Sequence, residues 1–137
     1  MNGYVKRTEI DNNLNDILNL NENNALKVMN LAERFGKYNL RNLASTKLRK
    51  FYDYILDIDT NKKEWFVRLV LLKPKIAYNI GKETKEAKKS LEDLEYLVNK
   101  VIDKIEEAKN DEKIKKFNNF KKFFEAVVAY HRIVNKN

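Results

Sequence analysis

Cysteine is absent from the 137 residues, and the chain has only one histidine, one proline and three glycines. Without cysteine there is no disulfide, no thiolate nucleophile and no cysteine zinc site. A single histidine cannot complete a structural zinc site either. We therefore predict no metal, no cofactor and no catalytic residue. The scarcity of glycine and proline argues against a fold rich in β-turns and favours long helices with short connections.

Long apolar runs are also missing. No stretch approaches the roughly 18 apolar residues that a membrane-spanning helix needs, and the first ten residues contain no apolar signal core. We expect a cytoplasmic protein that does not contact a membrane.

The composition is typical of a folded helical protein, with 43% hydrophobic and 35% charged residues. At this length the simplest organisation is a single helical domain over residues 1–137, an all-α bundle of five to six helices. We expect residues 1–9 to fray, and residues 1–20 to be frayed or loosely attached around a short amphipathic helix over residues 11–20.

Hydrophobic spacing predicts the other helices. They cover residues 25–37 (capped by Asn24), a segment starting at Ser45 or Thr46, residues 85–109 (capped by Thr84) and a last helix from residue 111. The expected buried stripes are Leu26, Met29, Ala32 and Phe35; Leu48, Phe51, Tyr52, Ile55 and Leu56; Leu91, Leu94, Leu97, Val98, Val101, Ile102 and Ile105; and Ile114, Phe117, Phe120, Phe123, Phe124 and Val127. His131 falls on the last stripe and is predicted to be buried and hydrogen-bonded.

Residues 65–82, WFVRLVLLKPKIAYNIGK, are predicted to form the element that the rest of the chain surrounds. Their first half is apolar around a single arginine, which favours a rod buried on most of its girth. Pro74 predicts a break near residues 72–73, with a second short helix beginning at the proline. Gly81 is expected to end that helix in a left-handed conformation.

Charge is segregated along the sequence. The net charge of +8 divides into +1 for residues 1–60, +6 for 61–90, −5 for 91–112 and +6 for 113–137. Such segregation favours a polyanionic partner, against the alternative of a lysine-rich solvated surface. The acidic side chains Glu92, Asp93, Glu95, Asp103, Glu106 and Glu107 are expected to point mainly outward, towards a basic patch of a neighbouring copy.

Three segments together resemble a known family. STKLRKFYDYI at residues 45–55, LLKPKIAYNIGK at 71–82 and FKKFFEAVVAYHRI at 120–133 are similar to the small helical subunit of the type III-A CRISPR effector, the Csm complex. The resemblance covers about residues 25–134. It implies a small all-α subunit without catalytic activity, several copies of which form an inner filament. The implied partners are guide RNA, target RNA, the backbone and large subunits, and neighbouring copies.

Basic residues carry the predicted RNA contacts, because a filament that accepts any guide sequence must hold the RNA backbone rather than read bases. The candidates are Lys47, Arg49, Lys50, Arg68, Lys73, Lys75, Tyr78 and Lys82. Each prediction has a competing interpretation. The cations of the first segment would form a solvated helix start that keeps the protein soluble, and Arg68, Lys73, Lys75 and Lys82 would pair with acids of a neighbouring helix. Tyr78 would be a core or interface ring instead of a stacking platform.

Two other functions are compatible with the residues. A helix-turn-helix regulator would use residues 39–50, with base-reading side chains at the start of its second helix. An adaptor bundle would bind only protein through its aromatic residues.

Overall fold

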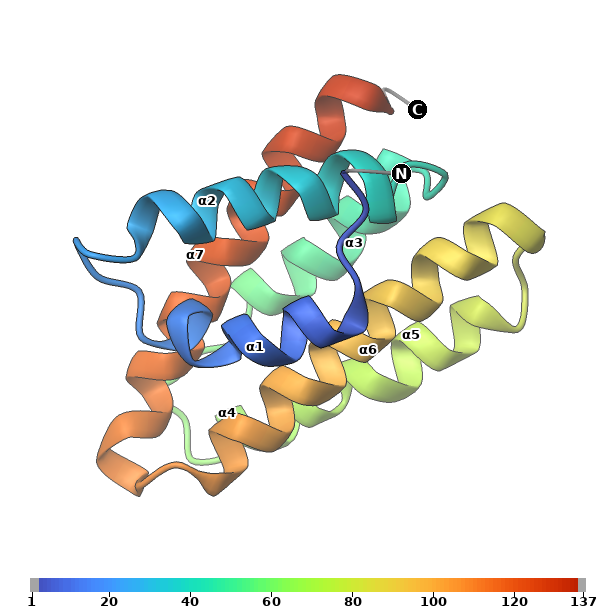
Figure 1. The fold of residues 1–137 in the computed structure, drawn as a ribbon. Helices are drawn as coiled ribbons and strands as arrows, with labels where there is room; N and C mark the ends of the chain where they lie inside the picture. Colours follow the sequence, from blue (N-terminus) through green and yellow to red (C-terminus); the bar gives the residue numbers. More distant parts are fainter. Residues whose placement is uncertain (1–2, 136–137) are drawn as a thin grey trace.

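The computed structural model describes residues 3–135, and within them the chain is helical with no strand. This confirms the predicted all-α bundle (Figure 1). The elements are α1 (Arg7–Leu18), α2 (Ala25–Arg34), the π-helix η1 (Phe35–Asn39), α3 (Ser45–Leu56), α4 (Trp65–Val70), α5 (Leu72–Ile80), α6 (Lys85–Glu107) and α7 (Asn110–Val134).

The central element is α7, which packs against α1, α2, η1, α3 and α6 (Figure 1). Its 25 residues carry apolar side chains at steps of three and four, which give a stripe wide enough to serve several neighbours. The four phenylalanines expected in the core, Phe117, Phe120, Phe123 and Phe124, are all buried. The predicted stripe of α6 is likewise buried in full.

The prediction that residues 65–82 form the buried centre is wrong. This stretch is divided into α4 and α5 at the edge of the bundle, where α5 lies beside α6 (Figure 1). Only Leu69, Leu72 and Ile76 are buried, and Val67 is 57% exposed. Each of these helices is short and packs against the bundle on one side only. Its apolar residues on the other side therefore remain exposed.

The break in this stretch is at Leu71, one to two residues before the expected position near residues 72–73. The first helix ends at Val70, and Pro74 lies in the first turn of α5, where a backbone N–H has no partner within its own helix. The expected left-handed Gly81 is wrong, because its φ of −65° is an ordinary helical value.

The expected fraying of the N-terminal region is wrong for residues 3–20. Val5 is buried, and its N–H and carbonyl each bond to the Asn39 side chain at 2.9 Å. The Arg34 guanidinium forms two hydrogen bonds with Glu9, at 2.8 and 2.9 Å, and also bonds the carbonyls of Gly3 and Tyr4. Ile10, Leu14, Ile17 and Leu18 of α1 are also buried, so apolar packing and polar side chains from distant parts of the chain together hold this segment on the bundle.

Three expected core residues are exposed instead: Leu26 at 77%, Leu56 at 50% and Ile114 at 38%. On α2 the buried positions are Val28, Leu31 and Ala32, followed by Phe35 in η1. A pattern of residues three apart drifts by about 60° per step around a helix of 3.6 residues per turn, so Leu26 and Phe35 cannot share one face.

Asn24 and Thr84 occupy the N-cap positions of α2 and α6 as predicted, but neither side chain caps its helix. The Asn24 amide instead bonds residues of the preceding connection and Asp16.

Gly36 allows η1 to lie directly on α7. A Cβ added at this position would come within 2.6 Å of the Val127 carbonyl oxygen, a backbone atom that cannot rotate away. The substitution Gly36→Ala should therefore lower the free energy of unfolding by about 1–3 kcal/mol, as overpacking does elsewhere. Urea unfolding followed by circular dichroism measures this.

The matched control is Gly81→Ala, because Gly81 has helical backbone angles and the nearest atom to an added Cβ is 3.6 Å away. Its stability should be unchanged or higher by up to about 1 kcal/mol. Equal effects at the two glycines would contradict the close packing of η1 on α7.

His131 is buried and its Nε2–H donates to the Leu43 carbonyl at 2.8 Å, which confirms the prediction. Burial lowers the pKa of the imidazole below its ordinary value, although the backbone carbonyls of Leu43 and Leu40 act in the opposite direction. The ring is therefore neutral in the folded bundle at neutral pH.

This lowered pKa makes stability depend on pH. Below about pH 6.5 the unfolded chain binds a proton at this residue more readily than the folded chain, so stability is complete above that pH and decreases on acidification. We expect the free energy of unfolding to fall between pH 7 and pH 5, and the fall to be smaller in His131→Gln. Identical pH profiles of the two proteins in urea titrations would exclude this role for the only histidine.

Candidate nucleic-acid interface

One flank of α3 and one flank of α5 lie next to each other and carry most of the predicted cations. On α3, Lys47, Lys50 and Tyr54 are three and four residues apart and so share a flank. Lys75, Asn79 and the following Lys82 have the same relation on α5 and just beyond it. The adjoining face of α3 supplies the buried residues Leu48, Phe51, Tyr52 and Ile55.

A hollow of about 260 Å³ lies between the start of α3 and the end of α5. Its walls are Thr46, Lys47, Lys50, Phe51, Asn79 and Lys82. Lys50 and Lys82 form no ion pair with any described residue. Two mobile positive charges at a concave polar surface are suited to an anionic oxygen ligand.

Further along the same flank, the Tyr54 ring contacts cations from two other helices. Arg68 of α4 and Lys75 of α5 lie 5.6 and 4.9 Å from the centre of its ring. The Tyr54 hydroxyl also donates to the Arg68 carbonyl at 2.7 Å, which ties α3 to α4. Cation–π contacts of this kind hold the charges in place without neutralising them.

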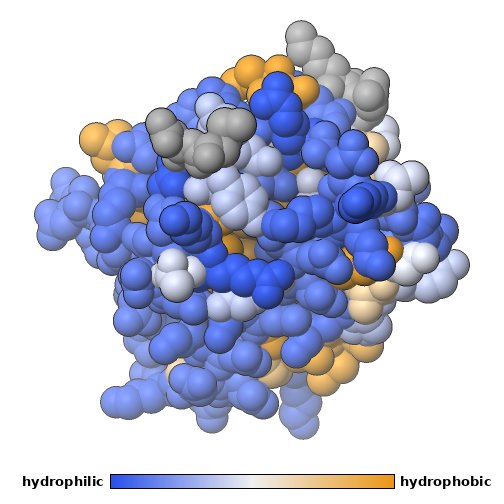
Figure 2. Space-filling model, turned by 45° about the vertical axis from the view of Figure 1, so that its right-hand side comes forward, coloured by the Kyte–Doolittle hydropathy of each residue, from blue (hydrophilic) through white to orange (hydrophobic). Residues whose placement is uncertain are grey.

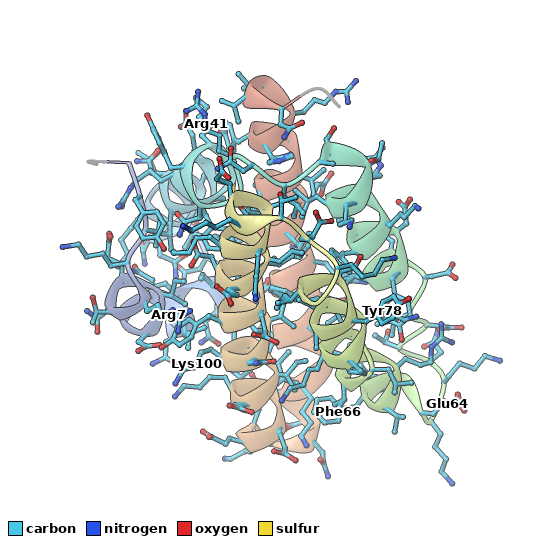
Figure 3. The ribbon with its side chains drawn as sticks, turned by 90° about the vertical axis from the view of Figure 1, so that its right-hand side faces the viewer. Arg7, Arg41, Glu64, Phe66, Tyr78 and Lys100 are labelled. Carbon is cyan, nitrogen blue, oxygen red and sulfur yellow. The ribbon has the colours of Figure 1, made fainter. Side chains whose placement is uncertain are left out.

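We call the set Lys47, Lys50, Arg68, Lys75 and Lys82 the α3–α5 basic face. Five of the eight predicted residues therefore come together from α3, α4, α5 and the connection after α5. Tyr78 lies at its border: the side chain is 68% exposed, with Lys82 Nζ 5.0 Å from the ring centre. Figure 3 shows Tyr78 on the side of α5 that faces away from α6. It is not a core ring.

Arg49 and Lys73 are not part of this face. Arg49 lies on the other flank of α3, 3.8 Å from Asp53, and lines a separate hollow together with Arg132 of α7. Lys73 is two residues before Lys75, which places it about 160° away around the α5 axis. The predicted grouping of Lys47, Arg49 and Lys50 as one contact surface is thus divided between two sides of α3.

Among ion pairs between described residues, Lys47 is the one member of the α3–α5 basic face with an acidic partner. Its ammonium group bonds to the carboxylate of Glu83, which lies in the connection between α5 and α6. Both side chains are about three-quarters covered. An acidic partner is therefore present for Lys47, from the α5–α6 connection, and for the exposed Arg49, from Asp53 of the same helix.

Two residues that were not predicted as site residues contribute to this face. Tyr54 organises Arg68 and Lys75, and Thr46 lines the hollow. Helical spacing could have identified Tyr54, because it follows Lys50 by four residues and therefore lies on the same flank of the predicted helix.

The expected outward orientation of the acidic residues on α6 is wrong for Asp93. This carboxylate is 2% exposed and accepts hydrogen bonds from the Tyr4 hydroxyl, the Lys89 ammonium and the Asn39 amide. Asp103, Glu106 and Glu107 are exposed as predicted. Within residues 3–135 no group of three or more histidine or acidic side chains could hold a metal ion.

No helix in the described part of the chain is both long and apolar enough to cross a membrane. The face shown in Figure 2 is hydrophilic over most of its area, with apolar side chains in separate patches.

The fold and this face define a small, basic, all-α bundle protein with concentrated positive charge on one side. A family model described as Csm2 Type III-A matches residues 22–137. The chain belongs to this family and is a small subunit of a type III-A CRISPR complex, which confirms the predicted resemblance. No curated protein and no solved structure matches it.

The role of Tyr54 in holding the α3–α5 basic face can be tested by two substitutions. Tyr54→Phe removes only the hydrogen bond to the Arg68 carbonyl and should cost about 0.5–1.5 kcal/mol of unfolding free energy. Tyr54→Leu also removes two cation–π contacts, and should cost a further ~0.5–1 kcal/mol for each. Equal stability of the two variants in urea unfolding would mean that Arg68 and Lys75 are not held by the ring.

Proposed function

We propose that this chain is a non-catalytic, RNA-contacting subunit of its Csm complex. In this role several copies form an inner filament along the duplex of guide RNA and target RNA, beside the backbone and large subunits. The observation that carries the proposal is the α3–α5 basic face, in which α3, α4, α5 and the connection after α5 contribute five cations to one side of the bundle. Membership of the Csm2 family supports it.

The chemistry of the face suits the RNA backbone. Four of its five cations are lysines, which act as mobile point charges and do not impose the planar geometry needed to read a base edge. Such groups hold phosphates in any sequence, while base pairing between guide and target supplies the specificity. Tyr78 offers an exposed ring for stacking at the border of this face.

The placement of the ionisable groups supports a role without catalysis. General acid–base chemistry needs a titratable group with access to a substrate. His131 and Asp93 are buried and already hydrogen-bonded within the bundle, and the exposed acids of α6 lie on a solvated helix surface. We accordingly assign the chain a binding role.

A helix-turn-helix regulator is less compatible with the start of α3. Its first residue, Ser45, is buried, and Lys47 is bonded to Glu83. A recognition helix would need these positions free to enter a major groove.

Charge reversal at Lys50 and Lys75 tests the proposal, because these residues lie at different points of the α3–α5 basic face and have no acidic partner among the described residues. The double variant Lys50→Glu/Lys75→Glu should bind a labelled single-stranded oligouridine at least tenfold more weakly. Its plot of log K against log salt should be shallower by about 1.4, since each lost phosphate contact on a single strand contributes about 0.7.

The matched control is Lys104→Glu/Lys122→Glu, which makes the same charge change at exposed positions of α6 and α7. All three proteins should have the same helix content by circular dichroism. Equal loss of affinity in both double variants would leave only a general charge effect and remove the site assignment. Selective binding of one duplex DNA would support the regulator instead.

A further inference from the structure

The hollow at the end of the α3–α5 basic face has the features of a binding site for one anionic group. Lys50 and Lys82 lie on its walls together with Thr46, whose side chain carries a hydroxyl group. Thr46 is the second residue of α3, a helix of 12 residues whose first turn has no side-chain cap. The positive end of the α3 helix dipole therefore lies beside this hollow.

A carboxylate already binds at the rim of this hollow. Glu83 reaches from the α5–α6 connection and bonds to Lys47, which is itself one of the walls. The three lysines and the one carboxylate leave a net charge of +2, so the hollow can accept a further negative charge. The Glu83 contact is local evidence that this position attracts an anionic oxygen.

Glu83 differs in its surroundings from the other acids next to predicted RNA residues. Its side chain is 21% exposed, whereas Asp53 beside Arg49 is 64% exposed and lies on the other flank of α3. An ion pair that is about three-quarters covered is screened less by salt than an exposed one. Glu83 thus neutralises Lys47 more effectively than Asp53 neutralises Arg49.

We propose that this hollow binds one phosphodiester group of RNA. In the absence of RNA, the Glu83 carboxylate takes the place of that group by pairing with Lys47, and RNA displaces it. The inference rests on the proposed function and adds a built-in competitor to it. Lys50 and Lys82 make the first contact with RNA, and Lys47 joins only when its carboxylate partner is released. Glu83 thereby weakens contact with isolated RNA and favours RNA that is already held by other subunits or copies.

The substitution Glu83→Gln tests this directly in the full chain. With Lys47 released, affinity for a labelled single-stranded oligouridine at low salt should rise about two- to fivefold, the range expected for breaking a partly exposed ion pair. The slope of log K against log salt should become steeper by about 0.7, because one more lysine releases a counterion.

The control is Asp53→Asn, which removes a carboxylate next to a cation on the opposite flank of the same helix and changes the net charge equally. Its affinity and salt slope should stay close to those of the wild type. Lys47→Gln should have little effect in the wild type but should abolish the gain in the Glu83→Gln background. Circular dichroism and urea unfolding establish that each variant is folded.

The outcomes separate the two proposals. If Glu83→Gln behaves like Asp53→Asn while charge reversal at Lys50 and Lys75 still weakens binding, the competitor role of Glu83 is overturned and the RNA-contacting role remains. If the wild type does not bind the oligouridine at all, both are overturned. If the gain in RNA affinity of Glu83→Gln persists when Lys47→Gln is added, the effect is due to overall charge. This result would contradict the proposal that Glu83 competes with RNA for Lys47.

Discussion

The structure depends on the close contact between η1 and α7. Gly36 brings the η1 backbone against the Val127 carbonyl, and the neighbouring turn of α7 places His131 under the Leu43 carbonyl. Asn39, at the end of the same π-helix, holds Val5 and contacts Asp93 of α6. One short segment therefore fixes the central helix, the N-terminal segment and the start of α3 relative to one another. The direction in which α3 leaves this region decides which of its flanks faces α5.

The α3–α5 basic face is a consequence of that placement. The apolar flank of α3 is used against α7, where Tyr52 stacks on Phe124 with ring centres 5.8 Å apart. The flank with Lys47, Lys50 and Tyr54 is then left beside α5, and Arg49 is carried to the other side. Tyr54 links this flank to Arg68 and Lys75, while Glu83 limits the charge at its other end. Core packing thus selects which cations act together.

The sequence was sufficient for features that depend on one helix at a time. The full stripe of α6, the four buried phenylalanines of α7 and the buried, bonded His131 follow from spacing within single helices. Features that depend on contacts between helices could not be predicted from the spacing within one helix. The Asn39 side chain bonds residues 34 and 54 positions away, so nothing near Val5 or Asp93 in the sequence signals their attachment. The exposed apolar residues of α4 and α5 resemble core residues until the neighbours are known.

The most direct test of the account is to map RNA–protein cross-links in the purified effector particle that contains this chain. Ultraviolet cross-linking followed by mass spectrometry of the peptides identifies the residues that touch RNA. The account predicts cross-links within residues 46–54 and 68–82, at the α3–α5 basic face and Tyr78. Cross-links confined to α1, α2 or the acidic surface of α6 would contradict it.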